Sequence, residues 1–156
     1  GGISLDKSIL IFVHCSRVCL MSMEQRKHKR FKGKEGAFAA FLTPDELINL
    51  GNVVDISMGG LCTRYLATTE KGPNCSGIKV FGSNGRFIHL ERVDCKIIYD
   101  FEIVEESLDQ LRTRKCGVQF RNLSVRQKAV LQDFIEHFTH RIIYMPSPVS
   151  VHTAAR

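Results

Sequence analysis

Residues 51–67 read GNVVDISMGGLCTRYLA, and this stretch decides the fold that the sequence predicts. Two strand-like segments, 51–56 and 61–67, flank the tetrapeptide SMGG at 57–60. Paired glycines tolerate a positive φ and are therefore typical of a tight turn. The stretch predicts a β-hairpin, and with it a domain built on antiparallel strand pairing.

Working outward, the chain offers further short strands on both sides of this hairpin. Segment 91–104 alternates apolar and polar residues, as a half-buried strand does. The GSNG sequence at 82–85 predicts a second tight turn. The sequence TPDE at 43–46 has a Thr cap, a Pro at the first helical position and a Glu three residues after the cap, so a single helical turn is expected there. The other predicted strands are 36–42, 77–81, 86–90 and 115–120.

A helix is expected to close the domain. Ser124 and Gln127 form a capping box, which marks a helix N-terminus. The apolar residues that follow at helical spacing are Val130, Leu131, Phe134, Ile135 and Phe138. The predicted fold is mainly β: a small antiparallel barrel of six to seven strands with a C-terminal amphipathic α-helix.

Length and composition indicate one domain of 156 residues with tails. We expect residues 1–22 to be a disordered or appended leader, 23–141 the domain, and 142–156 a C-terminal tail. The apolar run at 9–13 is too short and too interrupted for a membrane span, and no small-residue cleavage site of a signal peptide follows it.

The six cysteines contain no C-x-x-C pair, and most lie in strand-like apolar runs. This pattern favours reduced, buried thiols in a cytoplasmic protein over a disulfide framework. His14, Cys15 and Cys19 could be imagined as metal ligands, but no matching second pair follows them, so no metal site is predicted.

The charge of the chain is concentrated in one segment. Residues 26–34 (RKHKRFKGK) hold six of the 22 Lys and Arg residues and no acidic residue, which leaves 16 basic against 16 acidic residues elsewhere. The net charge of +6 therefore comes from this basic segment. Clustered cations suit a phosphate-bearing partner, although a solvated basic run has the same composition.

Two short motifs give the basic segment a more specific meaning. Arg26-x-x-x-Arg30 lies in it, and Asp55-x-Ser57-x-x-Gly60 follows about 25 residues later at the predicted hairpin turn. In this order, and with the closing stretch GVQFRNLS at 117–124, they resemble the PilZ domain, a bacterial receptor family for cyclic di-GMP. The resemblance covers roughly residues 24–140.

The resemblance implies a ligand site, and the residue types suit that ligand. Arginine can donate a bidentate pair to guanine or to phosphate, an Asp accepts from guanine N–H groups, and a Ser hydroxyl can donate to phosphate. Asp and Ser at such positions also cap turns, so a purely structural role for them stays open. The implied cyclic di-GMP site consists of Arg26, Arg30, Asp55, Ser57 and Gly60, with Gly59 and Gln25 at its edge.

The implied function is that of a receptor whose ligand orders residues 24–34. With one domain, the output would pass through an unidentified protein partner or a homodimer, and motility, polysaccharide or adhesion control would be typical of the family. We expect no enzyme, because the motifs supply no nucleophile or general base, and no cofactor, metal or membrane partner.

Two other functions are weighed against this one. A small basic barrel that binds nucleic acid would explain the basic segment, but the aromatic residues Phe38, Phe41, Phe81, Phe87 and Phe120 are better interpreted as core. A PilZ-type adaptor that binds no ligand is the other alternative, and the complete motifs argue against it.

Overall fold

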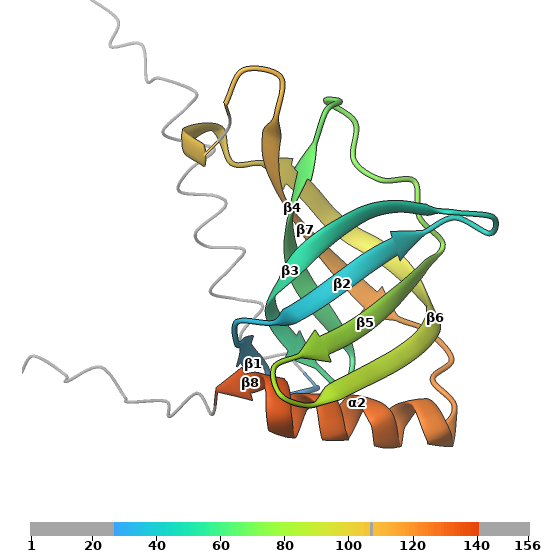
Figure 1. The fold of residues 1–156 in the computed structure, drawn as a ribbon. Coiled ribbons are helices and arrows are strands. Elements are labelled where there is room, and N and C mark those ends of the chain that lie inside the picture. Colours follow the sequence, from blue (N-terminus) through green and yellow to red (C-terminus); the bar gives the residue numbers. More distant parts are fainter. Residues whose placement is uncertain (1–26, 107, 141–156) are drawn as a thin grey trace, which may run out of the picture.

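The computed structural model describes residues 27–106 and 108–140, and its centre is a closed antiparallel barrel (Figure 1). Six strands follow one another around the barrel in the order β2-β5-β6-β7-β4-β3, and pairing of β3 with β2 closes it. The short strands β1 and β8 extend the sheet beyond β3. The strands are β1 Phe31–Gly33, β2 Ala37–Leu42, β3 Leu47–Ser57, β4 Gly60–Ala67, β5 Gly77–Ser83, β6 Phe87–Glu102, β7 Arg112–Phe120 and β8 Thr139–His140. The predicted barrel is thus confirmed.

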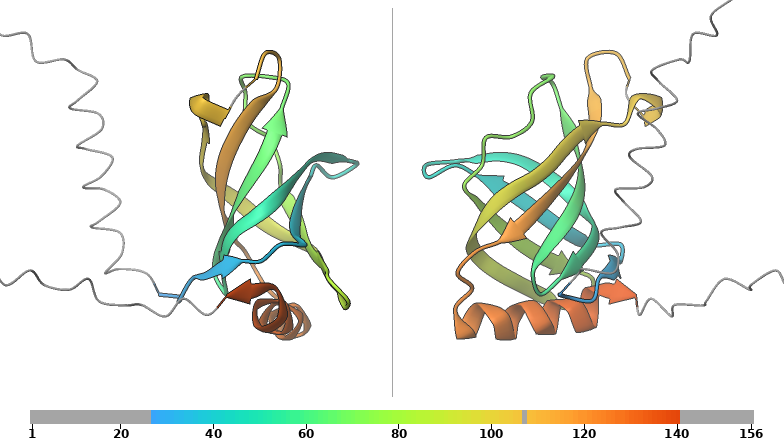
Figure 2. Two further views of the ribbon diagram at one scale, coloured as in Figure 1. Left: turned by 60° about the vertical axis from the view of Figure 1, so that its left-hand side comes forward. Right: turned by 180° about the vertical axis from the view of Figure 1, so that it is seen from behind.

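One helix, α2 (Val125–Phe138), lies across an end of the barrel (Figure 2). It begins at the predicted capping box: Gln127 N–H donates to Ser124 Oγ at 3.1 Å, and Ser124 N–H donates to Gln127 Oε1 at 2.9 Å. Four of the five predicted apolar positions are buried, and Val130 is half-buried. Burying a Leu, Ile or Phe side chain contributes about 1.5–3 kcal/mol, so this face accounts for the attachment of the helix.

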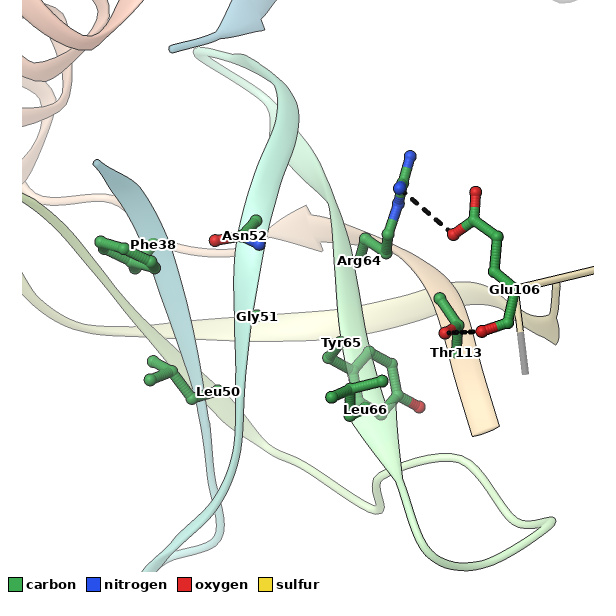
Figure 3. Close-up of a pocket in the computed structure, with 9 residues that line it drawn as sticks. All are labelled: Phe38, Leu50, Gly51, Asn52, Arg64, Tyr65, Leu66, Glu106 and Thr113. Carbon is green, nitrogen blue, oxygen red and sulfur yellow. Dashed lines mark hydrogen bonds and ion pairs between the residues drawn. The ribbon is translucent and has the colours of Figure 1, made fainter. Parts of the chain in front are cut away.

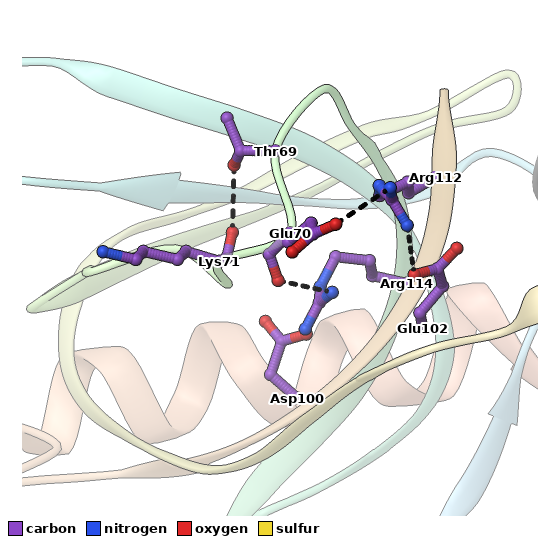
Figure 4. Close-up of polar contacts among 7 residues, drawn as sticks. All are labelled: Thr69, Glu70, Lys71, Asp100, Glu102, Arg112 and Arg114. Atoms are coloured by element: carbon purple, nitrogen blue, oxygen red, sulfur yellow. Dashed lines mark hydrogen bonds and ion pairs between the residues drawn. The ribbon is translucent and has the colours of Figure 1, made fainter. Parts of the chain in front are cut away.

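A polar network fastens the opposite end, where the loop after β4 meets β6 and β7 (Figure 4). Arg114 Nε donates to Asp100 Oδ1 at 2.7 Å, and its Nη1 donates to the Glu70 carbonyl at 3.0 Å. Asp100 also accepts from the Tyr65 hydroxyl at 2.5 Å. The Arg114 and Asp100 side chains are only 9% and 10% exposed, so each depends on the other to offset the cost of burying its charge.

Three predictions about local structure need correction. Residues 43–46 form the β2–β3 hairpin loop and contain no helical turn. The predicted strands 86–90 and 91–104 are one continuous strand, β6. Phe87 is 67% exposed and is not part of the core, because the β5–β6 register directs the next residue, Ile88, inward.

The aromatic and cysteine predictions are otherwise close to the structure. Phe41 and Phe120 are buried, while Phe38 and Phe81 are half-buried and stack on each other with ring centroids 5.7 Å apart. The four described cysteines, Cys62, Cys75, Cys95 and Cys116, are free thiols. In the part of the chain that the structure describes, the one α-helix does not have the length and apolar character needed to cross a membrane.

Several predictions lie outside the described residues and stay predictions. They concern the leader, the tail, the candidate ligands His14, Cys15 and Cys19, and the site residues Gln25 and Arg26.

Candidate functional site

The second arginine of the first motif meets the first residue of the second motif. Arg30 Nη1 lies 2.9 Å from Asp55 Oδ1, although 25 residues separate them in sequence. The side chains are 33% and 27% exposed, so both remain accessible to a ligand. The pair therefore joins the two motifs at the barrel surface.

Strand pairing and a β-bulge bring this pair together. β1 pairs with β3 so that Lys32 lies opposite Asp55, which places Arg30 just beyond the end of the pairing. In β3 the register with β4 shifts between Val53 and Asp55, leaving Val54 as an extra residue. Val53 is in the core, and the extra residue turns Asp55 to the outer face.

The Ser57-to-Gly60 turn forms the next part of the site. Ser57 Oγ accepts from the Gly59 N–H at 3.1 Å and donates to the Gly60 carbonyl at 3.3 Å. The hydroxyl thus caps the turn, which is the structural role that the sequence left open. If the Ser57 hydroxyl donated to a phosphate, its hydrogen bond to the Gly60 carbonyl would have to break.

Both glycines of the turn face close neighbours. A Cβ on Gly59 would lie 2.6 Å from His28 Cδ2, so the imidazole of His28 covers this residue. A Cβ on Gly60 would overlap the Val118 carbonyl oxygen of β7. Gly60 is therefore required by strand packing, whatever binds nearby.

A row of residues continues from Asp55 across the outer face of the barrel. Asp55 pairs with Cys62 in β4, Cys62 with Gly117 in β7, and Gly117 with Tyr99 in β6. Gly117 has no side chain, and the Tyr99 ring occupies that space; a Cβ there would overlap the ring. A second bulge, between Ile97 and Tyr99, sets this position.

The row is electrostatically neutral beyond Asp55. Burial raises the pKa of the Cys62 thiol above its ordinary value of 9.0. Burial, followed by the contact with Cys62, raises the pKa of the Tyr99 hydroxyl above 10.0. Both groups stay protonated near pH 7 and supply polar but uncharged atoms beside the ion pair.

These elements enclose an open groove of about 700 Å³. Three cationic side chains line it: Lys27 and Arg30 from the segment before β1, and Lys128 from α2. Among the described residues that line it, none is acidic, while Ile98 and Tyr99 give one wall an apolar surface. A positive groove with an apolar wall and turn amides suits a ligand that carries both phosphate and a flat ring.

The structure therefore places Arg30, Asp55, Ser57, Gly59 and Gly60 near one another; four of them line the groove, and Asp55 contacts it through its ion pair with Arg30. Sequence reasoning missed several residues that line the groove, among them His28, Ile98, Tyr99 and Lys128. The adjacent apolar residues Ile97 and Ile98 break the alternation of β6, and this break was the available signal of a bulge. Over the described residues there is no cluster of three or more His, Cys, Asp or Glu side chains that could hold a metal ion.

A second cavity, of about 410 Å³, lies on the outer face of β3 and β4 (Figure 3). Its charged side chains are already paired, Arg64 with Glu106 at 3.2 Å, and the Thr113 hydroxyl donates to the Glu106 carbonyl at 2.8 Å. No motif residue lines it. The groove at Arg30 is thus the stronger candidate.

Comparison with known proteins supports the fold at low sequence similarity. No family model and no curated protein matches the chain. Among solved structures, it is similar to YcgR from Escherichia coli in complex with c-di-GMP, at 21% identity and a TM-score of 0.51. The match covers 71% of this chain but only 44% of the YcgR chain. The isolated PilZ domain of the same protein with c-di-GMP is similar at 19% identity and a TM-score of 0.48, covering 72% of this chain and 90% of that one. The chain has the fold of a PilZ-like domain.

Proposed function

We propose that this PilZ-like domain is a receptor for cyclic di-GMP and binds it in the groove between residues 27–30 and the β3–β4 turn. The observation that carries the proposal is the Arg30–Asp55 pair, because it unites the two motifs at the edge of a cationic groove. The proposed ligand contacts are Arg30, Asp55, Ser57, Gly59 and Gly60, together with Arg26 and Gln25, which lie outside the described residues.

Arg30 and Asp55 together carry the donor and acceptor groups needed to recognise a guanine base. When a guanine enters, Arg30 can turn its guanidinium to O6 and N7, while Asp55 accepts from the N1 and N2 hydrogens. The ligand then replaces one exposed ion pair by two charge-assisted contacts, which makes the exchange favourable. Lys27 and Lys128 lie where they can neutralise phosphate charge.

The similar E. coli structure makes cyclic di-GMP the first ligand to test, since that protein was solved in complex with c-di-GMP. At 21% identity the likeness concerns the fold. The argument for the ligand therefore depends on the motif residues of this chain and their geometry.

The proposed conformational change is narrower than the sequence suggested. The sequence predicted that residues 24–34 are mobile without ligand. This prediction is wrong for Phe31–Gly33, because these residues form β1, which pairs with both β3 and β8. The segment that a ligand can order ends at Arg30. Since β1 pairs with β3 at Asp55 and with β8 at His140, we place the surface that changes for a protein partner, or a second copy, beside β1 and β8.

The test is a calorimetric titration of the full chain with cyclic di-GMP, with GTP and a short oligonucleotide as controls. Selective, saturable binding that Arg26→Ala and Asp55→Ala each weaken is the expected result. Hydrogen exchange should then show ligand-dependent protection before Phe31 and little change in β1.

Other results would favour the two alternatives. If calorimetry detects no binding of cyclic di-GMP, the receptor hypothesis is contradicted. An adaptor protein with this fold would then be the favoured function. Salt-sensitive binding of every polyanion, unchanged by Asp55→Ala, would indicate a nucleic-acid-binding barrel.

A further inference from the structure

A pair of cysteines lies outside the groove lining and has no part in the proposed ligand site. Cys75 is in the loop between β4 and β5, and Cys95 is in β6. The Cys95 backbone is hydrogen-bonded to Ser76, the residue next to Cys75, and the two thiols are near enough for each to shift the pKa of the other. Cys95 belongs to the buried core, whereas Cys75 packs against that core and is partly exposed. One thiol is thus open to a small solute while its neighbour is enclosed.

Backbone and side-chain hydrogen bonds hold the two cysteines in place. The Cys95 N–H donates to the Ser76 carbonyl at 3.2 Å. Arg92, also on β6, donates through Nη2 to Ser76 Oγ at 2.8 Å and through Nη1 to the Thr43 carbonyl at 2.8 Å. The loop beside Cys75 is therefore fastened to the strand that carries Cys95, and the thiol contact belongs to the folded state.

We propose that Cys75 and Cys95 are a redox modification site, at which a peroxide converts the thiol pair to a reversible disulfide in the folded domain. The Cys75 thiolate attacks a peroxide oxygen, the O–O bond breaks, and the released hydroxide takes up a proton to leave as water. The Cys95 sulfur then attacks the sulfenic sulfur of Cys75, the S–O bond breaks, and a second water leaves. The two thiols lose two electrons and the peroxide gains them.

The environments of the two cysteines indicate which thiol attacks the peroxide and which resolves the sulfenic acid. The contact with Cys95 lowers the pKa of the Cys75 thiol, and the charge of Arg92 favours its thiolate further. The same contact raises the pKa of the Cys95 thiol. Cys75 is accordingly the attacking thiol and Cys95 the resolving one, as expected where the exposed sulfur has more thiolate character. Cys116 is fully buried, which raises its pKa to about 12, and it serves as an internal control.

The experiment treats the full chain with hydrogen peroxide, blocks the remaining thiols by alkylation, and maps tryptic peptides without reduction. The sequence suits this method, because each of the six cysteines lies on a different tryptic peptide. We expect peptides 72–79 (GPNCSGIK) and 93–96 (VDCK) to be linked, with the mass of two hydrogens lost, and dithiothreitol to separate them. The oxidised chain should also have the higher Tm, since the crosslink restricts the unfolded state.

Three variants sharpen the result. Cys75→Ser and Cys95→Ser should each abolish the linked peptides, and Cys116→Ala should leave them unchanged. In Cys95→Ser the sulfenic acid at Cys75 has no resolving partner, so dimedone should trap it. Linkage of other cysteines in the native chain would overturn the proposal. So would conversion of Cys75 to sulfinic acid while Cys95 stays a thiol, or linkage that forms only after unfolding in urea.

Discussion

Replacing Arg30 by alanine should weaken ligand binding far more than it weakens the fold. The Arg30–Asp55 pair is close, at 2.9 Å, but its side chains are 33% and 27% exposed. Exposed ion pairs contribute about 0.2–1 kcal/mol, so the free energy of unfolding should fall by no more than about 1 kcal/mol. A lost charge-assisted hydrogen bond to a ligand costs about 1.5–3 kcal/mol. That loss raises the Kd for cyclic di-GMP roughly 10- to 100-fold.

The matched control is Arg64→Ala. Arg64 pairs with Glu106 at 3.2 Å, with side chains 49% and 41% exposed, and it lines the other cavity. Urea denaturation should give both variants a similarly small loss of stability, whereas calorimetry should give only Arg30→Ala a raised Kd. Equal weakening of binding by the two variants would refute the reasoning. So would an Arg30→Ala protein that loses more than about 2 kcal/mol of stability and keeps its Kd, since Arg30 would then be structural.

Three further predictions concern the stability of the barrel, and urea denaturation checks each of them. Gly60→Ala should cost about 1–3 kcal/mol, because its methyl group overlaps the Val118 carbonyl; unchanged stability would show that β4 and β7 can shift apart freely. Arg114→Met should cost about 3–5 kcal/mol by leaving Asp100 buried without its cation, and a loss under about 1 kcal/mol would contradict this role. Burial raises the pKa of the Cys116 thiol from 9.0 to about 12, so the unfolded chain loses this proton first and stability should fall between pH 9 and pH 12. Cys116→Val should flatten that slope, and an identical pH profile in the variant would assign the slope to other groups.

Features that depend on neighbouring residues were predictable from sequence. The hairpin around 57–60 and the capping box of α2 each need only a few adjacent side chains, and both form as expected. Apolar spacing likewise identified the buried face of α2. Such signals suffice because the interactions they describe are local.

The helical turn expected at 43–46 shows where a local signal is ambiguous. The Glu46 N–H does donate to Thr43 Oγ1 at 3.1 Å, as in a helix cap. The Thr43 N–H, however, donates to the Glu46 carbonyl at 3.0 Å, which closes a hairpin between β2 and β3. The pairing of β2 with β3, which includes Leu42 opposite Leu47, favours the hairpin loop over the helical turn. This strand pairing depends on the packing of the whole barrel.

The candidate site was predictable as a set of residues but not as a geometry. The motifs name Arg30 and Asp55, yet their contact depends on β1, a three-residue strand that no periodicity can identify. Lys128 reaches the groove only because α2 lies across the end of the barrel. Both facts come from long-range packing, which a single sequence does not display.

The bulges explain why the site lies on the outer face at all. Val53 and Ile97 face inward, so strict alternation would turn Asp55 and Tyr99 inward as well. An unpaired carboxylate in the core would cost several kcal/mol. Each strand instead carries one extra residue, which places Asp55 and Tyr99 at opposite ends of a single outer row. The β3 bulge therefore has two consequences, because it presents Asp55 to the ligand site and keeps the Asp55 carboxylate out of the core.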